Sequence, residues 1–546
     1  MLARQALDGG ARVGARDVAA AVHRISTRGD CTDFEALALL LLWHRIPEAS
    51  WEAGVREDVA SALTGLKYWI DQPGLDAMCY FTENHQLVWH VAQTLAGEAF
   101  AQVRFAVDGR TGAEHAGEGR RRASAWMRRK LDGGFSEFDS NAYLAIDSYA
   151  LAALVELGED AGLAEAATTL LNKTLLTLAS NSWRGIHGAA HGRSYVNTQR
   201  SARFEETSPI LRLVAGVGSL NDAVLPVTML ATAQRYEVPS VVRALAGTEP
   251  EEWWGRQVYR GELAFERDLL ERPYRSDVRV WRTPDVMLAS VQDYRAGLPG
   301  LQEHVWCATL APEVQVYVTH PANSDTGSSA RPNGWVGHRV LPRVHQHLEA
   351  LLHVQRFTST DPVRSTHLWF PAARFEEWTF VGEWIAGRLG GGFVAVATPG
   401  GVEPVESGDT AWQEWLPASG GSASGGSAAG GSAWVCVVGT EERDGDFADF
   451  VAALGDTAIV WDHRGSGDPG ALVIRPDGTT LELTFDTAFA VDGQPVGLGP
   501  EGRPEVEPHL DNPAVRLEFG ADVAHVAWGG AELRLDLARA RALLGG

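Results

Sequence analysis

The pattern of apolar residues changes near residue 270, and this change limits the fold more than any other feature of the chain. Before that point, segments such as "ENHQLVWHVAQTLAGEAF" and "SYALAALVELGED" carry apolar residues at i, i+3, i+4 and i+7. This spacing is typical of amphipathic helices, and several of the segments end in glycine, as helices often do. Residues 1–270 are therefore expected to form a helical domain: a bundle, a solenoid or a closed toroid of helical hairpins. No repeat of fixed length is visible, which argues against a regular solenoid.

Short β-rich runs separated by turn residues replace the helical pattern after residue 270. "VWCATLAPEVQVYVTHP" and "ALVIRPDGTTLELTF" are examples, with "PDGT" and "GGGF" as turn signals. Residues 271–546 are expected to form an antiparallel β-sandwich domain, which makes the chain an α+β multidomain protein. The Gly/Ser/Ala-rich segment 418–433 is predicted to be a flexible loop inside this domain, because strand-like sequence flanks it on both sides. The alternative is a linker to a separate small β module.

Charge and cysteine usage exclude several classes of protein. The net charge of −23 lacks the basic footprint of a nucleic-acid-binding protein, although a local cluster of cations can still attract an anionic substrate. The N-terminus lacks the apolar core of a signal peptide, and the run "FEALALLLLWHRI" is too short to span a bilayer. A cytoplasmic protein with no nucleic-acid or membrane partner is expected. The four cysteines have no CxxC spacing and are expected to be free, buried thiols (Cys31, Cys79, Cys307 and Cys436).

The stretch "CYFTENHQLVWH" places Glu83, Asn84 and His85 together at the start of an apolar helical segment. Buried polar groups cost free energy unless they are hydrogen-bonded, so these side chains either brace a helix end or face a cleft. An amide donor can neutralise a substrate carboxylate while an imidazole removes a nearby proton. His85 and His90 are five residues apart and lie on different helix faces, so they form a poor metal pair and no metal site is predicted.

Two further segments are dense in polar side chains. "GGFSEFDSNAY" carries Glu137 and Tyr143 on a loop that leads into a helix, which is a suitable rim for an active site. The alternative is that polar residues of this loop cap the helix. "SWRGIHGAAHGRSY" is interpreted as a glycine-containing loop that presents four polar side chains to a cleft (His187, His191, Arg193 and Tyr195). Arginine can hold a carboxylate in a two-pronged contact, although a solvated surface loop would have the same composition.

A fourth segment, "THPANSDTGSSARPNGWVG", lies in the β-rich part. Its Asn333 and Trp335 are candidate substrate-binding residues on a loop that folds over the mouth of the helical domain. The chain also contains 19 tryptophans, whose flat faces pack on sugar rings in binding clefts but also fill protein cores.

A helical domain with Asn84-His85, then Tyr143, followed by a β-sandwich domain, resembles the alginate lyases and heparinase-II/III-like polysaccharide lyases. The blocks "FSEFDSNAY" and "NSWRGIHGAAHGRSY" also look like a group of uncharacterised bacterial proteins of the same build. The resemblance implies an (α/α) toroid followed by an antiparallel β domain. It also implies an Asn or His that neutralises a uronate carboxylate, and a Tyr or His that moves protons.

The leading hypothesis is β-elimination in a uronate-containing oligosaccharide or polysaccharide. Asn84, helped by Arg193 or His191, would neutralise the carboxylate; His85 or Tyr143 would take the C5 proton, and Tyr143 or Tyr195 would protonate the leaving oxygen. No cofactor is expected, since the chain has no dinucleotide or P-loop motif.

Two alternatives stay open. A glycoside hydrolase would use two carboxylates, Glu83 and Glu137, across the scissile bond. A non-catalytic carbohydrate-binding protein would use tryptophan faces without turnover.

Overall fold

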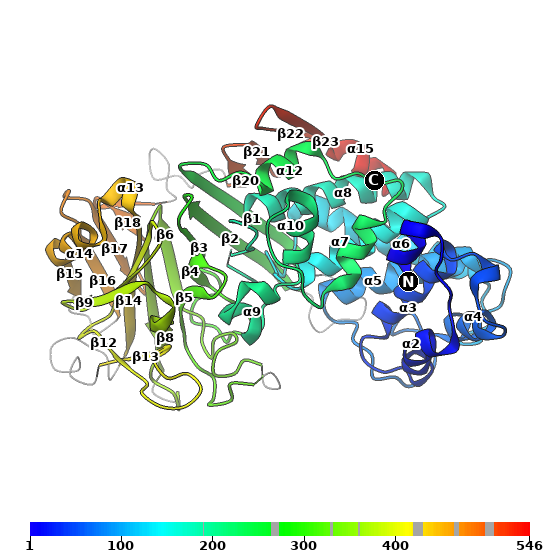
Figure 1. Cartoon of the computed structure of the whole chain (residues 1–546), viewed down its shortest axis with the longest axis horizontal. Helices are drawn as coiled ribbons and strands as arrows, with labels where there is room; N and C mark the ends of the chain where they lie inside the picture. The colour runs from blue at the N-terminus through cyan, green and yellow to red at the C-terminus, as the bar shows by residue number, and fades with distance from the viewer. Residues whose placement is uncertain are drawn as a thin grey trace.

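The computed structural model describes residues 1–188, 190–263, 272–327, 331–358, 361–418, 430–462, 469–496 and 507–545. Within these ranges a helical part and a β part lie end to end along the long axis of the molecule (Figure 1). The chain is therefore an α+β protein, as the sequence predicts.

Twelve of the described helices precede the first strand. They are α1 (Leu2–Asp8), α2 (Ala15–Thr27), α3 (Thr32–Arg45), α4 (Val55–Gly65), α5 (Glu83–Ala99) and α6 (Gly112–Gly133). After these follow α7 (Tyr143–Leu157), α8 (Ala161–Ser180), α9 (Val196–Arg200), α10 (Ser208–Ala215), α11 (Val224–Ala231) and α12 (Ser240–Ala246).

Close backbone approach joins α5 to α6. A Cβ on Gly97 of α5 would lie 2.3 Å from the Ala116 nitrogen of α6, so this contact requires glycine. A capping box opens α6: the Thr111 hydroxyl accepts a hydrogen bond from the Glu114 amide, and the Glu114 carboxylate accepts one from the Thr111 amide. The long helices that carry the site residues are thus fixed against each other by their own sequence.

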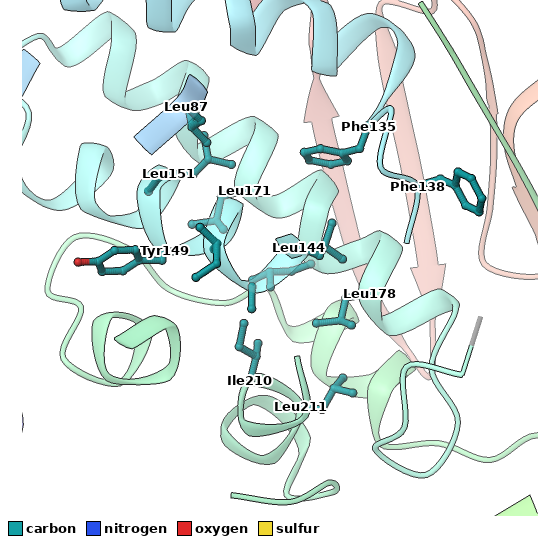
Figure 2. Packing of buried hydrophobic residues seen from close by; sticks show 14 of the residues in the cluster. Leu87, Phe135, Phe138, Leu144, Tyr149, Leu151, Leu171, Leu178, Ile210 and Leu211 are labelled. Atoms are coloured by element: carbon teal, nitrogen blue, oxygen red, sulfur yellow. The ribbon is translucent and has the colours of Figure 1, made fainter. Parts of the chain in front are cut away.

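The core of the helical part forms around α7, which is buried on nearly every side. Figure 2 shows side chains of α5, α7, α8 and α10 converging there (Leu87, Leu144, Leu151, Leu171, Leu178 and Leu211). A helix that is apolar all round belongs in an interior. Polar residues of α7 such as Tyr143 and Asp147 are therefore held by a rigid surround.

The strands of the ten-stranded sheet come from both ends of the β part. In sheet order they are β12 (Val402–Pro404), β13 (Glu414–Pro417), β8 (His367–Trp369), β5 (Val314–Thr319), β4 (Trp306–Ala311), β3 (Met287–Gln292), β2 (Arg272–Arg282), β1 (Trp253–Leu263), β20 (Pro508–Asn512) and β21 (Val515–Glu518). All neighbouring pairs are antiparallel. β1 lies inside the span expected to be helical. This segment is a strand because it pairs along its whole length with β2, from Trp253 opposite Arg282 to Leu263 opposite Arg272.

The six-stranded sheet has the order β6 (Arg343–His347), β7 (Ala350–Arg356), β14 (Gly431–Thr440), β11 (Gly392–Ala397), β10 (Trp384–Leu389) and β9 (Glu377–Val381). The smaller sheets are β15 (Ala458–Trp461), β16 (Gly470–Ile474), β17 (Thr480–Thr484), β18 (Ala490–Val491) and β19 (Gln494–Pro495), and the pair β22 (Val523–Trp528) and β23 (Ala531–Asp536). Three helices follow the first strands: α13 (Glu441–Asp444), α14 (Phe447–Asp456) and α15 (Leu537–Leu543).

Both faces of the six-stranded sheet are covered. Along β14, Cys436 and Val438 join the large core shared with the helical part and the ten-stranded sheet. Val435 and Val437 point the other way, into a second core with α14, β16 and β17. Burial on both faces explains why "AWVCVVG" is continuously apolar instead of alternating.

The C-terminal residues return to the helical part. Arg539 of α15 forms an ion pair with Glu165 of α8, and Arg541 donates to Asp132 of α6 at 2.7 Å. Trp528 of β22 packs edge-on against Trp253, with ring centroids 5.2 Å apart.

The expected division of the chain into two domains at residue 270 stays a prediction. Residues 419–429 of the expected flexible loop lie outside the described residues, and its end from Gly431 belongs to β14.

Among the described residues, no helix combines the length and the apolar character that a bilayer crossing requires.

Candidate functional site

The first residue of α5, Glu83, is buried and fully engaged. Its carboxylate accepts hydrogen bonds from the Ser136 and Glu137 amides at 2.9 and 3.0 Å and forms an ion pair with Lys130 of α6. The Glu83 and Lys130 side chains are each 1% exposed. Glu83 therefore fixes the start of α5 to the loop that follows α6, and this placement favours a bracing role.

Asn84 follows at the same helix start and is completely buried. The Thr82 hydroxyl donates to Asn84 Oδ1 at 2.7 Å. Among the described residues no protein acceptor meets the Asn84 Nδ2 group. A buried donor without a partner costs about 1–3 kcal/mol, so this amide is an unsatisfied polar group at the start of α5.

Glu137, Tyr143, Arg193 and Tyr195, predicted from two separate segments, meet at the centre of the site. Arg193 Nη1 lies 3.0 Å from Glu137 Oε1, and its guanidinium stands 5.0 Å from the centre of the Tyr143 ring. The Tyr143 and Tyr195 phenol oxygens share a hydrogen bond. Arg331, from the β part, lies over the Tyr195 ring at 5.1 Å. Two phenols thus sit between two guanidinium groups.

The electrostatics of this group follow from partial burial. Burial raises the pKa of Tyr143 well above its ordinary value, and Tyr195 adds to the shift. Burial alone would lower the pKa of Arg193. The Glu137 carboxylate beside it raises this pKa above its usual value. The arginine therefore stays cationic and the Tyr143 phenol stays protonated.

A cavity of about 1010 Å³ opens in the helical part, and neither phenol of the pair lines it. Ile146, one turn after Tyr143 on α7, and Asn197, two residues after Tyr195, line its wall. Cations, carboxylates, amides and apolar side chains are all part of the lining (among them Arg203, Phe204, Glu206, Arg212, Leu220, Asn221 and Asp222). The Phe204 side chain is 54% exposed, as suits a ring that packs on a sugar face. The volume and the mixed lining suit an oligosaccharide segment.

The predicted histidines His187 and His191 lie deeper, at the junction of the two parts of the molecule. His191 and His304 exchange backbone hydrogen bonds of 2.8 Å in both directions, and His191 Nδ1 contacts the Asp139 carbonyl. Burial lowers the pKa of His191 well below its ordinary value. His187 is completely buried, with Nε2 3.6 Å from Asp139 Oδ1. His191 is therefore placed to hold the junction and the Arg193–Tyr195 segment, whereas neither ring nitrogen of His187 has a hydrogen-bond partner among the described residues.

A buried carboxylic acid, Glu205, also contacts the junction between the two parts of the molecule. Glu205 accepts a hydrogen bond from the His187 amide at 2.8 Å, and Asn141 Nδ2 lies 3.4 Å from its other oxygen. Burial raises the pKa of Glu205 to about 8. Burial also raises the pKa of Glu206, which lines the cavity, to about 7.

His85 points to a different neighbourhood. Its Nδ1 lies 2.7 Å from Asp33 Oδ2, and its ring stacks on Phe34 of α3 at 4.9 Å. The structure therefore places His85 on the α3 side of α5.

Asn333 and Trp335 hold their own loop together. Asn333 Oδ1 accepts hydrogen bonds from the Trp335 and Val336 amides at 2.8 Å, while Trp335 is 1% exposed and stacks on His367. The residue of this loop that reaches the phenol pair is Arg331, which the sequence analysis did not select. Lys130 and the cavity wall at 203–206 were also missed, because the charged runs that contain them, "RRKLD" and "RFEETS", are equally typical of solvated surfaces.

Comparison with protein-family models finds no match for this chain, and comparison with curated proteins finds none either. Among solved structures, the chain is similar to one described as "Crystal Structure of Heparinase III", with a TM-score of 0.35 and 9% identity. That similarity covers 89% of this chain and 82% of the other. A likeness at this level gives no basis for transferring chemistry from one protein to the other.

Proposed function

We propose that this protein is a carbohydrate-active enzyme that cleaves a uronate-containing oligosaccharide or polysaccharide by β-elimination. The observation that carries the proposal is the Tyr143–Tyr195 phenol pair, flanked by Arg193 and Arg331. The rigid surround for these groups would be an (α/α) toroid built by the helical part, with the β part as a sandwich behind it.

β-Elimination removes the proton at C5, next to the carboxylate, and expels the glycosidic oxygen from C4. The C4–O bond breaks, a C4=C5 double bond forms, and the C5 electrons pass through an enolate-like transition state. Cations and amide donors aimed at the carboxylate stabilise that state more than the ground state. Arg193 and the unpaired Nδ2 of Asn84 supply such groups.

The phenol pair supplies the proton transfer. Tyr143, whose pKa burial raises, keeps its proton and can therefore act as the donor in the hydrogen bond that it shares with Tyr195. Together with the Arg331 cation, this hydrogen bond stabilises a Tyr195 phenolate. Tyr195 takes the C5 proton and returns it to the leaving C4 oxygen. His85 has no part in this scheme because Asp33 holds its ring on the α3 side. His191 acts by positioning the loop that carries Arg193 and Tyr195.

The hydrolase alternative meets a geometric obstacle for the Glu83 and Glu137 pair that the sequence predicts. It needs two carboxylates free to act across a glycosidic bond, one of them as an acid with a raised pKa. Glu83 is occupied by Lys130 and two backbone amides, and Glu137 is paired with Arg193. A lyase has no such requirement, so the geometry favours elimination.

The test is the absorbance of the unsaturated uronate product during incubation with a panel of uronate-containing oligosaccharides. Wild type is compared with Tyr195→Phe and with Tyr236→Phe, which removes a phenol bonded to Asn172 elsewhere in the helical part. A rise in wild type and Tyr236→Phe that Tyr195→Phe abolishes supports the proposal. New reducing ends without absorbance, lost in Glu137→Gln, would make the protein a hydrolase. Saccharide binding with neither product would make it a binding protein.

A further inference from the structure

Two half-buried cysteines and a histidine gather beside the start of α5, away from the phenol pair. One oxygen of Asp30, the sulfur of Cys31 and a ring nitrogen of His85 all lie within 4.8 Å of one another. Burial works against the Cys79 thiolate, but the neighbouring His85 imidazole lowers the pKa of this thiol. We infer that Asp30, Cys31, Cys79 and His85 form a binding site for a single zinc ion that joins α3 to the first turn of α5. This inference goes beyond the proposed lyase chemistry and does not depend on it.

The donor set matches the preferences of zinc. Zn²⁺ takes four ligands in tetrahedral geometry from cysteine sulfur, histidine nitrogen and carboxylate oxygen. Two thiolates favour zinc over magnesium or calcium, which prefer oxygen ligands alone. The four groups come from three separate parts of the chain, so one ion would fix the start of α3, the segment before α5 and α5 itself.

The orientation of His85 supports metal binding. A metal-binding histidine usually donates its other ring N–H to a carboxylate, which fixes the tautomer. Asp33 Oδ2 lies 2.7 Å from His85 Nδ1, and the Asp33 side chain is completely buried. With Nδ1 engaged, Nε2 is the ring nitrogen left to face the thiols. Asp33 is thus a positioning residue for the metal ligand.

The backbone conformation of Cys31 is a further observation in favour of a metal site. Cys31 is the N-cap residue of α3 with a left-handed φ of 62°, and its side chain makes no capping hydrogen bond. A left-handed conformation costs free energy for a residue with a Cβ and persists where the surroundings determine it. Asparagine or glycine would satisfy this position at lower cost, so the thiol is retained for a purpose other than capping.

Charge and access also fit a dication. The Asp30 carboxylate and the Cys31 thiol meet beside His85, while the nearby Arg24 guanidinium lies 3.6 Å from Glu35 and contacts the Asp30 carbonyl. Cys31 and Cys79 are partly exposed, whereas Cys307 and Cys436 are buried in the β part. An ion can therefore reach the first pair from solvent.

The test uses the full-length reduced protein and Co²⁺ as a spectroscopic substitute for Zn²⁺. We expect one equivalent of Co²⁺ to bind and to produce the near-ultraviolet charge-transfer band of a cobalt–thiolate bond, which Zn²⁺ then abolishes by displacement. Cys31→Ser and Cys79→Ser should each weaken the band, and Cys307→Ser should retain it. Asp33→Asn should lower the affinity about 10- to 100-fold, as loss of a partner to a ligating histidine does. Absence of the band in wild type, or its persistence in both serine variants, would overturn the inference.

A second measurement needs no variant and remains informative if a substitution prevents folding. The native wild-type protein is alkylated with iodoacetamide with and without Zn²⁺, and the modified cysteines are identified by peptide mass. Zn²⁺ should protect Cys31 and Cys79 together, while the buried Cys307 and Cys436 stay unmodified in both conditions. Equal modification of Cys31 and Cys79 with and without Zn²⁺ would refute the site. A lyase assay that failed would leave both metal measurements unaffected.

Discussion

The phenol oxygens of Tyr143, at the start of α7, and Tyr195, at the N-cap of α9, share a hydrogen bond, and a guanidinium lies over each ring. The pair is formed by two loops far apart in the sequence, yet it is held by a buried helix on one side and by the junction with the β part on the other. Two phenols in contact act as a unit, so their substitution effects should not add.

The first prediction concerns this unit. Tyr195→Phe should lower kcat by about 10²- to 10⁴-fold, the usual contribution of a positioned acid or base. Tyr143→Phe should have a smaller effect, because it removes only the hydrogen bond that stabilises the Tyr195 phenolate. The double variant should be no slower than Tyr195→Phe alone. Steady-state kinetics on the best uronate substrate provide the measurement, and independent, multiplying losses would contradict the model.

The second prediction concerns Arg193. Arg193→Lys keeps the positive charge but loses the planar two-pronged contact with a carboxylate. A hydrogen bond to a charged group contributes about 1.5–3 kcal/mol, so kcat/KM should fall by about 10- to 100-fold. The matched control is Arg184→Lys on the same segment, whose exposed guanidinium stacks on Trp183. An analogue without the carboxylate cannot undergo the elimination, so its binding is measured instead; Arg193→Lys and wild type should bind it equally, and a difference would assign Arg193 to another part of the substrate.

The change from helices to antiparallel strands could be predicted from the sequence because hydrophobic period is a local property. The start of β1 could not, because Trp253–Leu263 becomes a strand through pairing with β2. The packing of α15 against α8 could not be predicted either, since the Arg539–Glu165 ion pair joins residues that are far apart in the sequence. Contacts between residues far apart in the sequence do not produce a periodic pattern of apolar residues that could be recognised.

The same distinction applies to the site. Glu137, Tyr143, Arg193 and Tyr195 stand in polar clusters of the sequence, and the structure brings them together. Arg331 was missed because its role depends on how the β part packs on the helices. The partners of His85 were missed for a similar reason: Asp33 and Cys31 lie on another helix, and neither has a recognisable ligand spacing to His85.

The third prediction concerns the buried ion pair of Glu83 and Lys130. Lys130→Met leaves the Glu83 carboxylate buried with only its two amide donors, and removal of one partner of such a pair costs about 3–5 kcal/mol. Adding Glu83→Gln to Lys130→Met should recover part of this loss, because no uncompensated charge remains. Urea unfolding followed by tryptophan fluorescence measures both. The control is Arg388→Met, which breaks a surface pair with Glu376 that is 32% and 50% exposed and should cost at most about 1 kcal/mol. If Lys130→Met and Arg388→Met lowered the free energy of unfolding equally, the buried ion pair would contribute no more to stability than the surface pair.

The fourth prediction concerns Glu205 and the pH dependence of stability. Burial raises the pKa of Glu205 from 4.5 to about 8 in the folded protein. An acid with a raised pKa contributes stability that is fully present below its unfolded pKa and is lost as pH rises through the folded value. The wild-type protein should therefore lose stability relative to Glu205→Gln between about pH 4.5 and pH 8, with no further change above that range.

Glu205→Gln is suited to this test because it keeps an oxygen that can accept the hydrogen bond from the His187 amide. The measurement is the urea midpoint of wild type and variant across that pH range, read as the difference between the two proteins so that other titrating groups cancel. Glu237→Gln, at a side chain that is 88% exposed, provides the matched control and should follow wild type at every pH. A Glu205→Gln curve parallel to wild type would show that Glu205 is already ionised in the folded protein. The junction between the histidine loop and Asn141 would then rest on a buried carboxylate anion that accepts both hydrogen bonds.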